Sequence, residues 1–119
     1  MGHVRVTVEI IHPVDRLKSV SIDNALVGTG ATRTTVSRAI AQELGLEILG
    51  TQPVRTARGP QSIDQSHAML RIEGRQSIND VWISDSYPGI LIGVVTLEAM
   101  GFGVDPKNQR LIDVEQLLL

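Results

Sequence analysis

Apolar residues occupy every second position at the start of the chain, in the stretch HVRVTVEII: Val4, Val6, Val8 and Ile10. A period of two is typical of a β-strand with one buried face. The HPVDR that follows predicts a loop, and residues 17–27 predict a second strand whose last three residues are all apolar. The chain therefore opens with two strands.

After Gly30 the apolar period changes, and Val36, Ile40 and Leu44 recur every four residues. This spacing predicts an amphipathic helix that includes Val36. Gly45 stands directly after the pattern, where a left-handed C-terminal cap favours glycine. We expect the helix to end there.

The middle of the chain returns to a period of two. Residues 51–72 predict two strands joined at Gly59 and Pro60, and residues 73–84 predict a turn around Gly74 followed by another strand. These segments extend the sheet that the first two strands begin.

The last third repeats the earlier order of features in shorter form. An apolar strand over residues 90–92 meets Gly93, a short helix covers residues 94–100, and Gly101 caps it. A hairpin with its turn at residues 106–109 and a VEQLLL tail complete the chain. The Leu-Val-Gly and Leu-Ile-Gly segments thus form a degenerate repeat of two copies, which favours a two-fold-like pairing inside one β domain.

The length and composition agree with this pattern. At 119 residues we expect a single domain over residues 1–119. Apolar residues make up 42% of the chain but aromatic ones only 3%, so the core must be aliphatic. Many β-branched residues and eleven glycines favour a sheet with many turns.

The charge and residue usage exclude several kinds of partner. The net charge is −2 with Lys and Arg dispersed, so we expect no nucleic-acid binding. There is no cysteine, and His3, His12 and His67 lack metal-ligand spacing, so we expect no metal and no cofactor. No apolar run approaches the ~18 residues of a membrane span. We expect a cytoplasmic protein without membrane contact in this chain, which leaves open a membrane-tethered parent.

The Gly-Thr-Gly at residues 28–30 does not fit a nucleotide site. A dinucleotide fingerprint needs a third glycine where Arg33 stands, and a phosphate loop needs a Gly-Lys-Ser/Thr that is absent. Ser37, His67 and an aspartate could form a triad on paper, but no nucleophile elbow supports one.

Two segments resemble retropepsin-like aspartic proteases. ALVGTGATRTTVSRAIAQELGL, residues 25–46, is similar to the family's active-site region, in which two apolar residues precede Asp-Thr/Ser-Gly-Ala. ILIGVVTLEAMGFGVDPKNQRLI, residues 90–112, resembles the family's second characteristic segment. The resemblance spans residues 20–112. It implies a mostly β, retropepsin-like closed barrel of six or more strands with two short helices.

The resemblance also implies an activity, peptide-bond hydrolysis. In this family two aspartates of a dimer share a proton and activate one water. Because the chain carries the motif once, the resemblance implies a homodimer with the site on its two-fold axis and a peptide or protein as substrate.

The chain departs from the family at the catalytic position. Gly28 stands where the family has its aspartate, and Asp23, five residues upstream, lies on the opposite strand face by parity. Loss of acid–base catalysis alone lowers rates about 10²- to 10⁴-fold. We therefore predict that this chain is inactive.

Two origins fit this departure. An engineered Asp-to-Gly change is favoured, because the loop otherwise keeps what the active enzyme needs. A natural, non-catalytic peptide-binding or dimerisation module of the same fold is the alternative. A second alternative for the function is a small β-barrel interaction domain whose Gly-Thr-Gly is only a tight turn.

The resemblance assigns roles to the remaining loop residues. Thr29 would hydrogen-bond across the dimer axis, and Gly30 would let the loop reverse without a Cβ clash. Ala31 would line the floor of the cleft. Thr32 and Arg33 could contact the substrate backbone or a partner's acid, with a solvated arginine as the alternative.

The resemblance also assigns a flap and a scaffold. The hairpin of residues 56–63 corresponds to the flap that closes over a peptide, with a plain surface hairpin as the alternative. Its tip supplies four expected substrate contacts: Ala57, Arg58, Gly59 and Pro60. Residues 92–94 are expected to pack behind the site.

Overall fold

The structure is a computed structural model that describes residues 4–116, which form nine strands and two helices. In chain order the elements are β1 (Arg5–Ile11), β2 (Ser19–Val27), β3 (Thr34–Ser37), α1 (Arg38–Leu44), β4 (Gly50–Thr56), β5 (Gly59–Ile72), β6 (Arg75–Ser84), β7 (Ile90–Ile92), α2 (Val94–Met100), β8 (Phe102–Asp105) and β9 (Arg110–Asp113).

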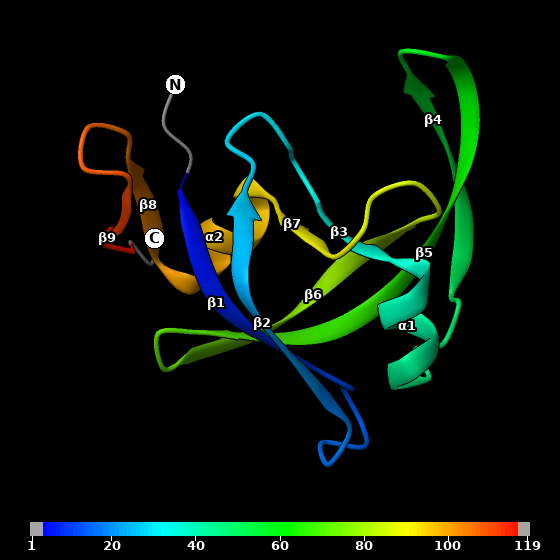
Figure 1. Ribbon diagram of the computed structural model, residues 1–119, viewed down its shortest axis with the longest axis horizontal. Helices are drawn as coiled ribbons and strands as arrows, with labels where there is room; N and C mark the ends of the chain where they lie inside the picture. Colours follow the sequence, from blue (N-terminus) through cyan, green and yellow to red (C-terminus); the bar gives the residue numbers. More distant parts are fainter. Residues whose placement is uncertain (1–3, 117–119) are drawn as a thin grey trace.

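Six of the strands form a closed barrel (Figure 1). Their order is β1-β2-β7-β3-β6-β5, and β1 closes the barrel by pairing with β5. Strand β4 pairs only with β5, outside the barrel, and β8 and β9 form a separate two-stranded sheet. The expected closed barrel of at least six strands with two short helices is confirmed.

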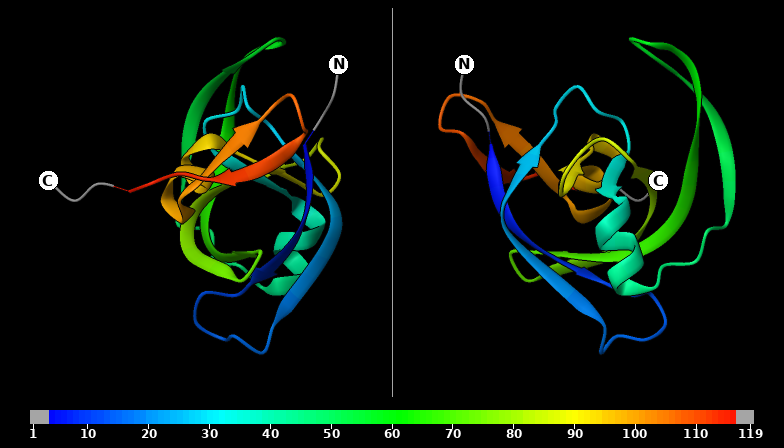
Figure 2. Two further views of the ribbon diagram at one scale, coloured as in Figure 1. Left: turned by 90° about the vertical axis from the view of Figure 1, so that its left-hand side faces the viewer. Right: turned by 45° about the vertical axis from the view of Figure 1, so that its right-hand side comes forward.

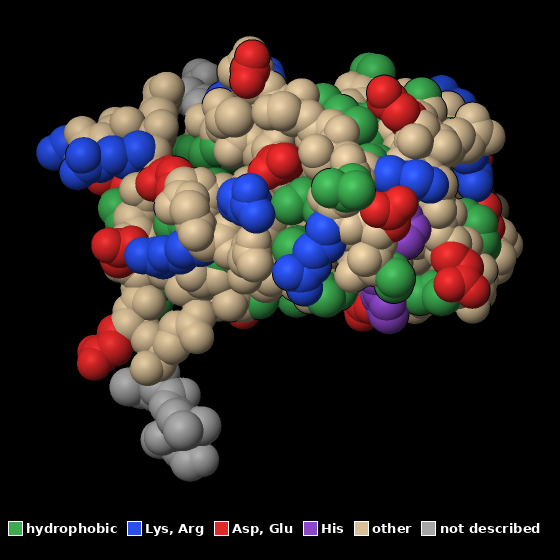
Figure 3. All heavy atoms as spheres, turned by 90° about the horizontal axis from the view of Figure 1, so that it is seen from below, with side chains coloured by type: hydrophobic (Ala, Val, Ile, Leu, Met, Phe, Trp, Pro, Cys, Tyr) green, Lys and Arg blue, Asp and Glu red, His purple; other side chains and the backbone are tan. Residues whose placement is uncertain are grey.

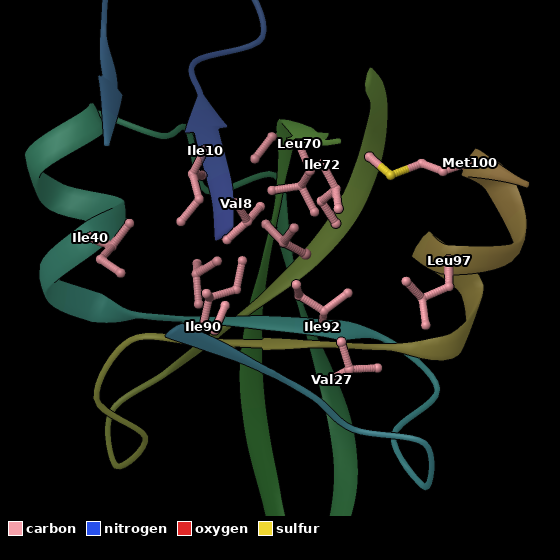
Figure 4. Packing of buried hydrophobic residues seen from close by; sticks show 14 of the residues in the cluster. Val8, Ile10, Val27, Ile40, Leu70, Ile72, Ile90, Ile92, Leu97 and Met100 are labelled. Atoms are coloured by element: carbon pink, nitrogen blue, oxygen red, sulfur yellow. The ribbon is translucent and has the colours of Figure 1, made fainter. Parts of the chain in front are cut away.

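Aliphatic side chains fill the barrel (Figure 4). Val8, Ile10, Leu70, Ile72 and Ile92 from β1, β5 and β7 have no exposed surface. Complete burial of one such side chain contributes roughly 1.5–3 kcal/mol. Along β1, Val8 and Ile10 alternate with the exposed Thr7 and the half-buried Glu9, so the period of two reflects one wall of this core.

The first helix is shorter than the apolar spacing predicts. Val36 belongs to β3, where it pairs with Ile83 of β6 on one side and Ile90 of β7 on the other. Pairing on both sides outweighs the local helical period, and the inclusion of Val36 in the helix was wrong. The helix begins at Arg38 after Ser37, whose hydroxyl accepts the Ile40 N–H over 3.2 Å.

Both glycine caps were predicted correctly. Gly45 and Gly101 end α1 and α2 with φ values of 69° and 78°, in the left-handed region that favours glycine. The final hairpin also has its turn where the sequence predicts it. Of the VEQLLL tail, residues 114–116 follow β9 without regular structure, and residues 117–119 lie outside the described part.

The barrel presents three loops on one side. In Figure 1 the loop of residues 28–33, the connection of residues 85–89 and the tip of the β4–β5 hairpin rise on the upper side. The first helix and the β1–β2 loop lie on the lower side. Figure 2, turned about the vertical axis, keeps this arrangement.

The surface mixes charges of both signs. On the face seen from below, basic and acidic side chains are interspersed (Figure 3). Within residues 4–116, neither helix has the length and apolar character needed to cross a bilayer.

Candidate functional site

The loop of residues 28–33 joins β2 to β3 on the upper side of the barrel. Thr29, Gly30 and Thr32 are exposed, whereas Gly28, Ala31 and Arg33 are half-buried. All six predicted loop residues therefore lie together, in one short segment with an exposed apex.

The two copies of the internal repeat pair with each other. Strands β2 and β7 are parallel neighbours, with Leu26 beside Leu91 and Val27 beside Ile92. The Gly28 N–H donates to the Ile92 carbonyl over 2.9 Å. Leu-Val-Gly and Leu-Ile-Gly thus run side by side into the site, so the predicted pairing of the two copies is confirmed, as a parallel pair of strands.

Backbone hydrogen bonds hold the loop against the start of α2. The Ala31 N–H donates to the Gly28 carbonyl over 2.9 Å. The Val94 and Val95 N–H groups donate to the carbonyls of Ala31 and Thr32 over 2.8 and 3.1 Å. These hydrogen bonds hold the backbone at position 28 in a defined place relative to α2.

A buried pair of threonines lies behind the loop of residues 28–33 and stabilises it. The hydroxyl oxygens of Thr34 and Thr96 lie 2.6 Å apart, and Thr34 Oγ1 accepts the Gly93 N–H over 3.0 Å. A Cβ on Gly93 would lie 2.4 Å from the carbonyl carbon of Arg33, so only glycine fits there. Gly93 and its neighbours pack behind the loop, as expected for a scaffold. No local pattern predicts the threonine pair, because its members are 62 residues apart.

Gly28 is not required by its backbone conformation. Its φ lies outside the left-handed region, and an added Cβ would meet Cδ1 of Leu91 at 2.8 Å and the Cβ of Ala31 at 3.2 Å. The nearer atom is the end of a flexible, half-buried side chain that can rotate away. A side chain therefore fits at position 28 if Leu91 rotates away and Ala31 shifts by a few tenths of an ångström.

The expectation that glycine at position 30 avoids a Cβ clash was wrong within the single chain. A Cβ on Gly30 would have no heavy atom within 4 Å, and its φ is not left-handed. The loop reverses without needing a glycine at this position. The glycine instead leaves open space at the apex of the loop.

The polar loop residues differ in their contacts. Arg33 pairs with Asp80 of β6 at 3.2 Å, and the other oxygen of that carboxylate lies 2.7 Å from His67 Nε2. Arg33 therefore has an acid partner within its own chain. Thr29 makes no side-chain hydrogen bond within residues 4–116, so its exposed hydroxyl remains available.

The predicted flap is the β4–β5 hairpin, and its turn lies slightly earlier than expected. Ala57 and Arg58 form the turn, whereas Gly59 and Pro60 begin β5, so the placement of the turn at Gly59 and Pro60 was wrong. Thr56 stabilises it, because its hydroxyl accepts the Arg58 N–H over 3.1 Å and donates to the Gly59 carbonyl over 3.0 Å. These bonds fix the reversal before Gly59.

A hollow of about 450 Å³ lies between this hairpin and the β6–β7 connection. Ala57 and Arg58 line it, together with Val54, Thr56 and residues 61–63 and 83–86. Gly59, Pro60 and the loop of residues 28–33 do not. The structure thus brings half of the predicted flap residues to a hollow, but not the loop, although both lie on the same side of the barrel.

Arg38 links β5 to Asp85, which lines the hollow. Its Nε and Nη2 donate to the carboxylate of Asp85 over 2.8 and 3.2 Å, and its Nη1 donates to Asp64 over 2.8 Å. Asp64 also accepts the Thr51 hydroxyl over 3.1 Å. The hydrogen bonds from Arg38 lower the pKa of the Asp85 carboxyl, and both carboxylates raise the pKa of Arg38. The sequence did not reveal this cluster, because its members are distant in the chain.

The described residues form neither a cluster of metal ligands nor the Ser-His-Asp triad considered above. Within residues 4–116 no three His, Asp or Glu side chains gather as metal ligands. Ser37 caps α1 and His67 pairs with Asp80, so these two side chains have separate structural roles. The arrangement offers an exposed, hydrogen-bonded loop and a separate hollow. No protein-family model matches this chain, and no curated protein matches it either.

Proposed function

We propose that this chain is a retropepsin-like aspartic endopeptidase domain whose peptide-cleaving site forms across a homodimer and which is inactive because Gly28 replaces the catalytic aspartate. The observation that carries the proposal is the loop of residues 28–33. It follows one Leu-Val-Gly strand, hydrogen-bonds to the parallel Leu-Ile-Gly segment, and exposes its apex.

The chemistry requires two such loops to face each other. Two adjacent carboxylates cannot both ionise readily, so they hold one proton between them, and the pair can activate water and protonate the leaving group. Residues 28–33 contain no Asp or Glu. A dimer of this chain would position and bind a peptide but would lack the groups that activate water.

Two features of the loop support a dimer. The Thr29 hydroxyl is exposed and free of hydrogen bonds within the described chain, so it can bond to a partner loop. The space next to Gly30 is open. A second loop can therefore approach the backbone at the apex without a clash.

A carboxylate at position 28 is compatible with the surrounding atoms. The closest obstacle is Cδ1 of Leu91, which is half-buried and can change rotamer. Gly28→Asp should therefore fold and dimerise. We expect it to cleave peptides between about pH 4 and 7, where such dyads work.

The test is a peptide-library cleavage assay with and without a transition-state-mimicking aspartic protease inhibitor. We expect inhibitor-sensitive cleavage by Gly28→Asp and none by the unmodified chain. Gly30→Asp is the matched control, because it places the same carboxylate two residues away in open space. A folded, dimeric Gly28→Asp protein that cleaves nothing would overturn the endopeptidase assignment, and a monomer at high concentration in sedimentation would overturn the shared site.

One observation favours a second candidate, a natural non-catalytic peptide-binding or dimerisation module of the same fold. A methyl group of Leu91 occupies the space that a Cβ at position 28 would need. Leu91 can thus keep this rotamer only with glycine at position 28. An aspartate codon at position 28 in the natural gene would contradict this candidate and establish an engineered origin.

A further inference from the structure

The hollow beneath the β4–β5 hairpin has an apolar part. Val54 of β4 and Ile63 of β5 are half-buried and contribute aliphatic side chains to its lining. Ile83 of β6 also borders the hollow, but its side chain is buried in the barrel core. A single aliphatic or aromatic side chain of a ligand would therefore find a nonpolar contact surface here.

The charges at the hollow are unequal. Asp85 lies in one wall and accepts two hydrogen bonds from Arg38, which also pairs with Asp64. Arg58 lies at the tip of the hairpin in the opposite wall, and the six ion pairs of residues 4–116 do not include it. The hollow thus presents one cation without a described acidic partner, while its carboxylate is already paired.

The rest of the lining is uncharged and can hydrogen-bond. Thr56, Ser62 and Ser86 carry hydroxyl groups, and Gln61 carries an amide. Such groups can satisfy the backbone of an extended chain without selecting its side chains. Selectivity should therefore come from the aliphatic surface and from Arg58.

We propose that this hollow selects extended peptides in which an apolar side chain lies next to an acidic one, the apolar side chain on Val54 and Ile63 and the carboxylate facing Arg58. The inference rests on the proposed peptide-binding function and names its substrate class. Since Arg58 lies at an exposed tip, its ion pair should change affinity by about two- to fivefold at low salt and less at high salt.

The unmodified chain is suited to the test, because Gly28 should prevent cleavage during the measurement. Fluorescein-labelled peptides that differ at one position, Glu, Gln or Lys beside a fixed Leu, are titrated with the protein and followed by fluorescence anisotropy. We expect affinity to fall in the order Glu, Gln, Lys, and the differences to shrink as salt is added.

Two charge-reversing variants show which arginine causes the preference among the three peptides. Arg58→Glu should invert the order, so that the Lys peptide binds best. Arg55→Glu is the matched control: Arg55 belongs to the same hairpin but is not part of the lining. It should preserve the order.

Each outcome decides a different point. Binding of all three peptides with equal affinity would overturn the acidic preference and leave the proposed peptide binding intact. Inversion by Arg55→Glu as well as by Arg58→Glu would overturn the role of the hollow. If the folded protein binds none of the peptides, and no wider library yields a ligand, peptide binding itself is wrong.

Discussion

The amide of Gly28 donates a hydrogen bond to the carbonyl of Ile92 over 2.9 Å, at the point where the two Leu-(Val/Ile)-Gly strands end side by side. This bond positions the first residue of the loop relative to Gly93 and α2. The geometry of position 28 is therefore set by a segment far away in the sequence. Three predictions test how the two segments depend on each other and on the charged cluster beside them.

Replacement of Gly93 should destabilise the loop directly. In Gly93→Ala the new Cβ would lie 2.4 Å from the Arg33 carbonyl carbon and 2.7 Å from the carbonyl oxygens of Arg33 and Thr32. These are backbone atoms that cannot rotate away, so we expect a loss of about 1–3 kcal/mol or more in the free energy of unfolding, measured in urea.

Gly30→Ala provides the control for that measurement. Its Cβ would have no heavy atom within 4 Å and its φ suits any residue, so monomer stability should change by less than about 0.5 kcal/mol. Equal losses for the two variants would contradict the close packing of Gly93 against Arg33.

The two residues of the buried Thr34–Thr96 pair should contribute unequally to the free energy of unfolding. Thr34→Val removes the acceptor of the Gly93 N–H and the partner of Thr96, so we expect a loss of roughly 1–3 kcal/mol of unfolding free energy. Thr96→Val removes only one bond, and Thr34 still accepts from Gly93. It should therefore have the smaller effect.

A double-variant cycle measures the coupling of these threonines. Because the two hydroxyls bond to each other, the combined loss should be smaller than the sum of the single losses. Strictly additive losses, or a larger loss for Thr96→Val than for Thr34→Val, would show that the two hydroxyls do not act as a pair.

The Arg38–Asp85 pair should make stability depend on acid pH. Hydrogen bonds from Arg38 lower the pKa of Asp85 below its ordinary value of 3.8 in the folded chain. A carboxyl with a lowered folded-state pKa contributes stability above its unfolded pKa and loses that contribution as the pH falls through the folded value. Stability should therefore decrease as the solution is acidified below about pH 4.

Arg38→Gln should flatten this part of the pH profile of thermal unfolding. Arg16→Gln removes the same charge from a residue outside the described ion pairs and is the control. Asp105, whose pKa is lowered by Asn108, retains its contribution in both variants. Identical acid profiles for the two variants would exclude Arg38 as the cause.

The sequence by itself predicted the elements whose signals are local. The period of two in β1, the turn around Gly74, and the glycines that end both helices depend on neighbouring residues alone, and each lies where it was expected. The two Leu-(Val/Ile)-Gly copies were also visible, because each consists of a few adjacent residues. The position of the exposed loop followed from them.

Tertiary structure decided everything that depends on pairing across the chain. Val36 is in a strand because β6 and β7 flank it, although its spacing favours a helix. Gly93 must be glycine because Arg33 lies against it, whereas a Cβ at Gly30 would have no heavy atom within 4 Å. The Thr34–Thr96 bond, the Arg38 cluster and the lining of the hollow all join residues that no local pattern connects, because their contacts arise only when the barrel closes.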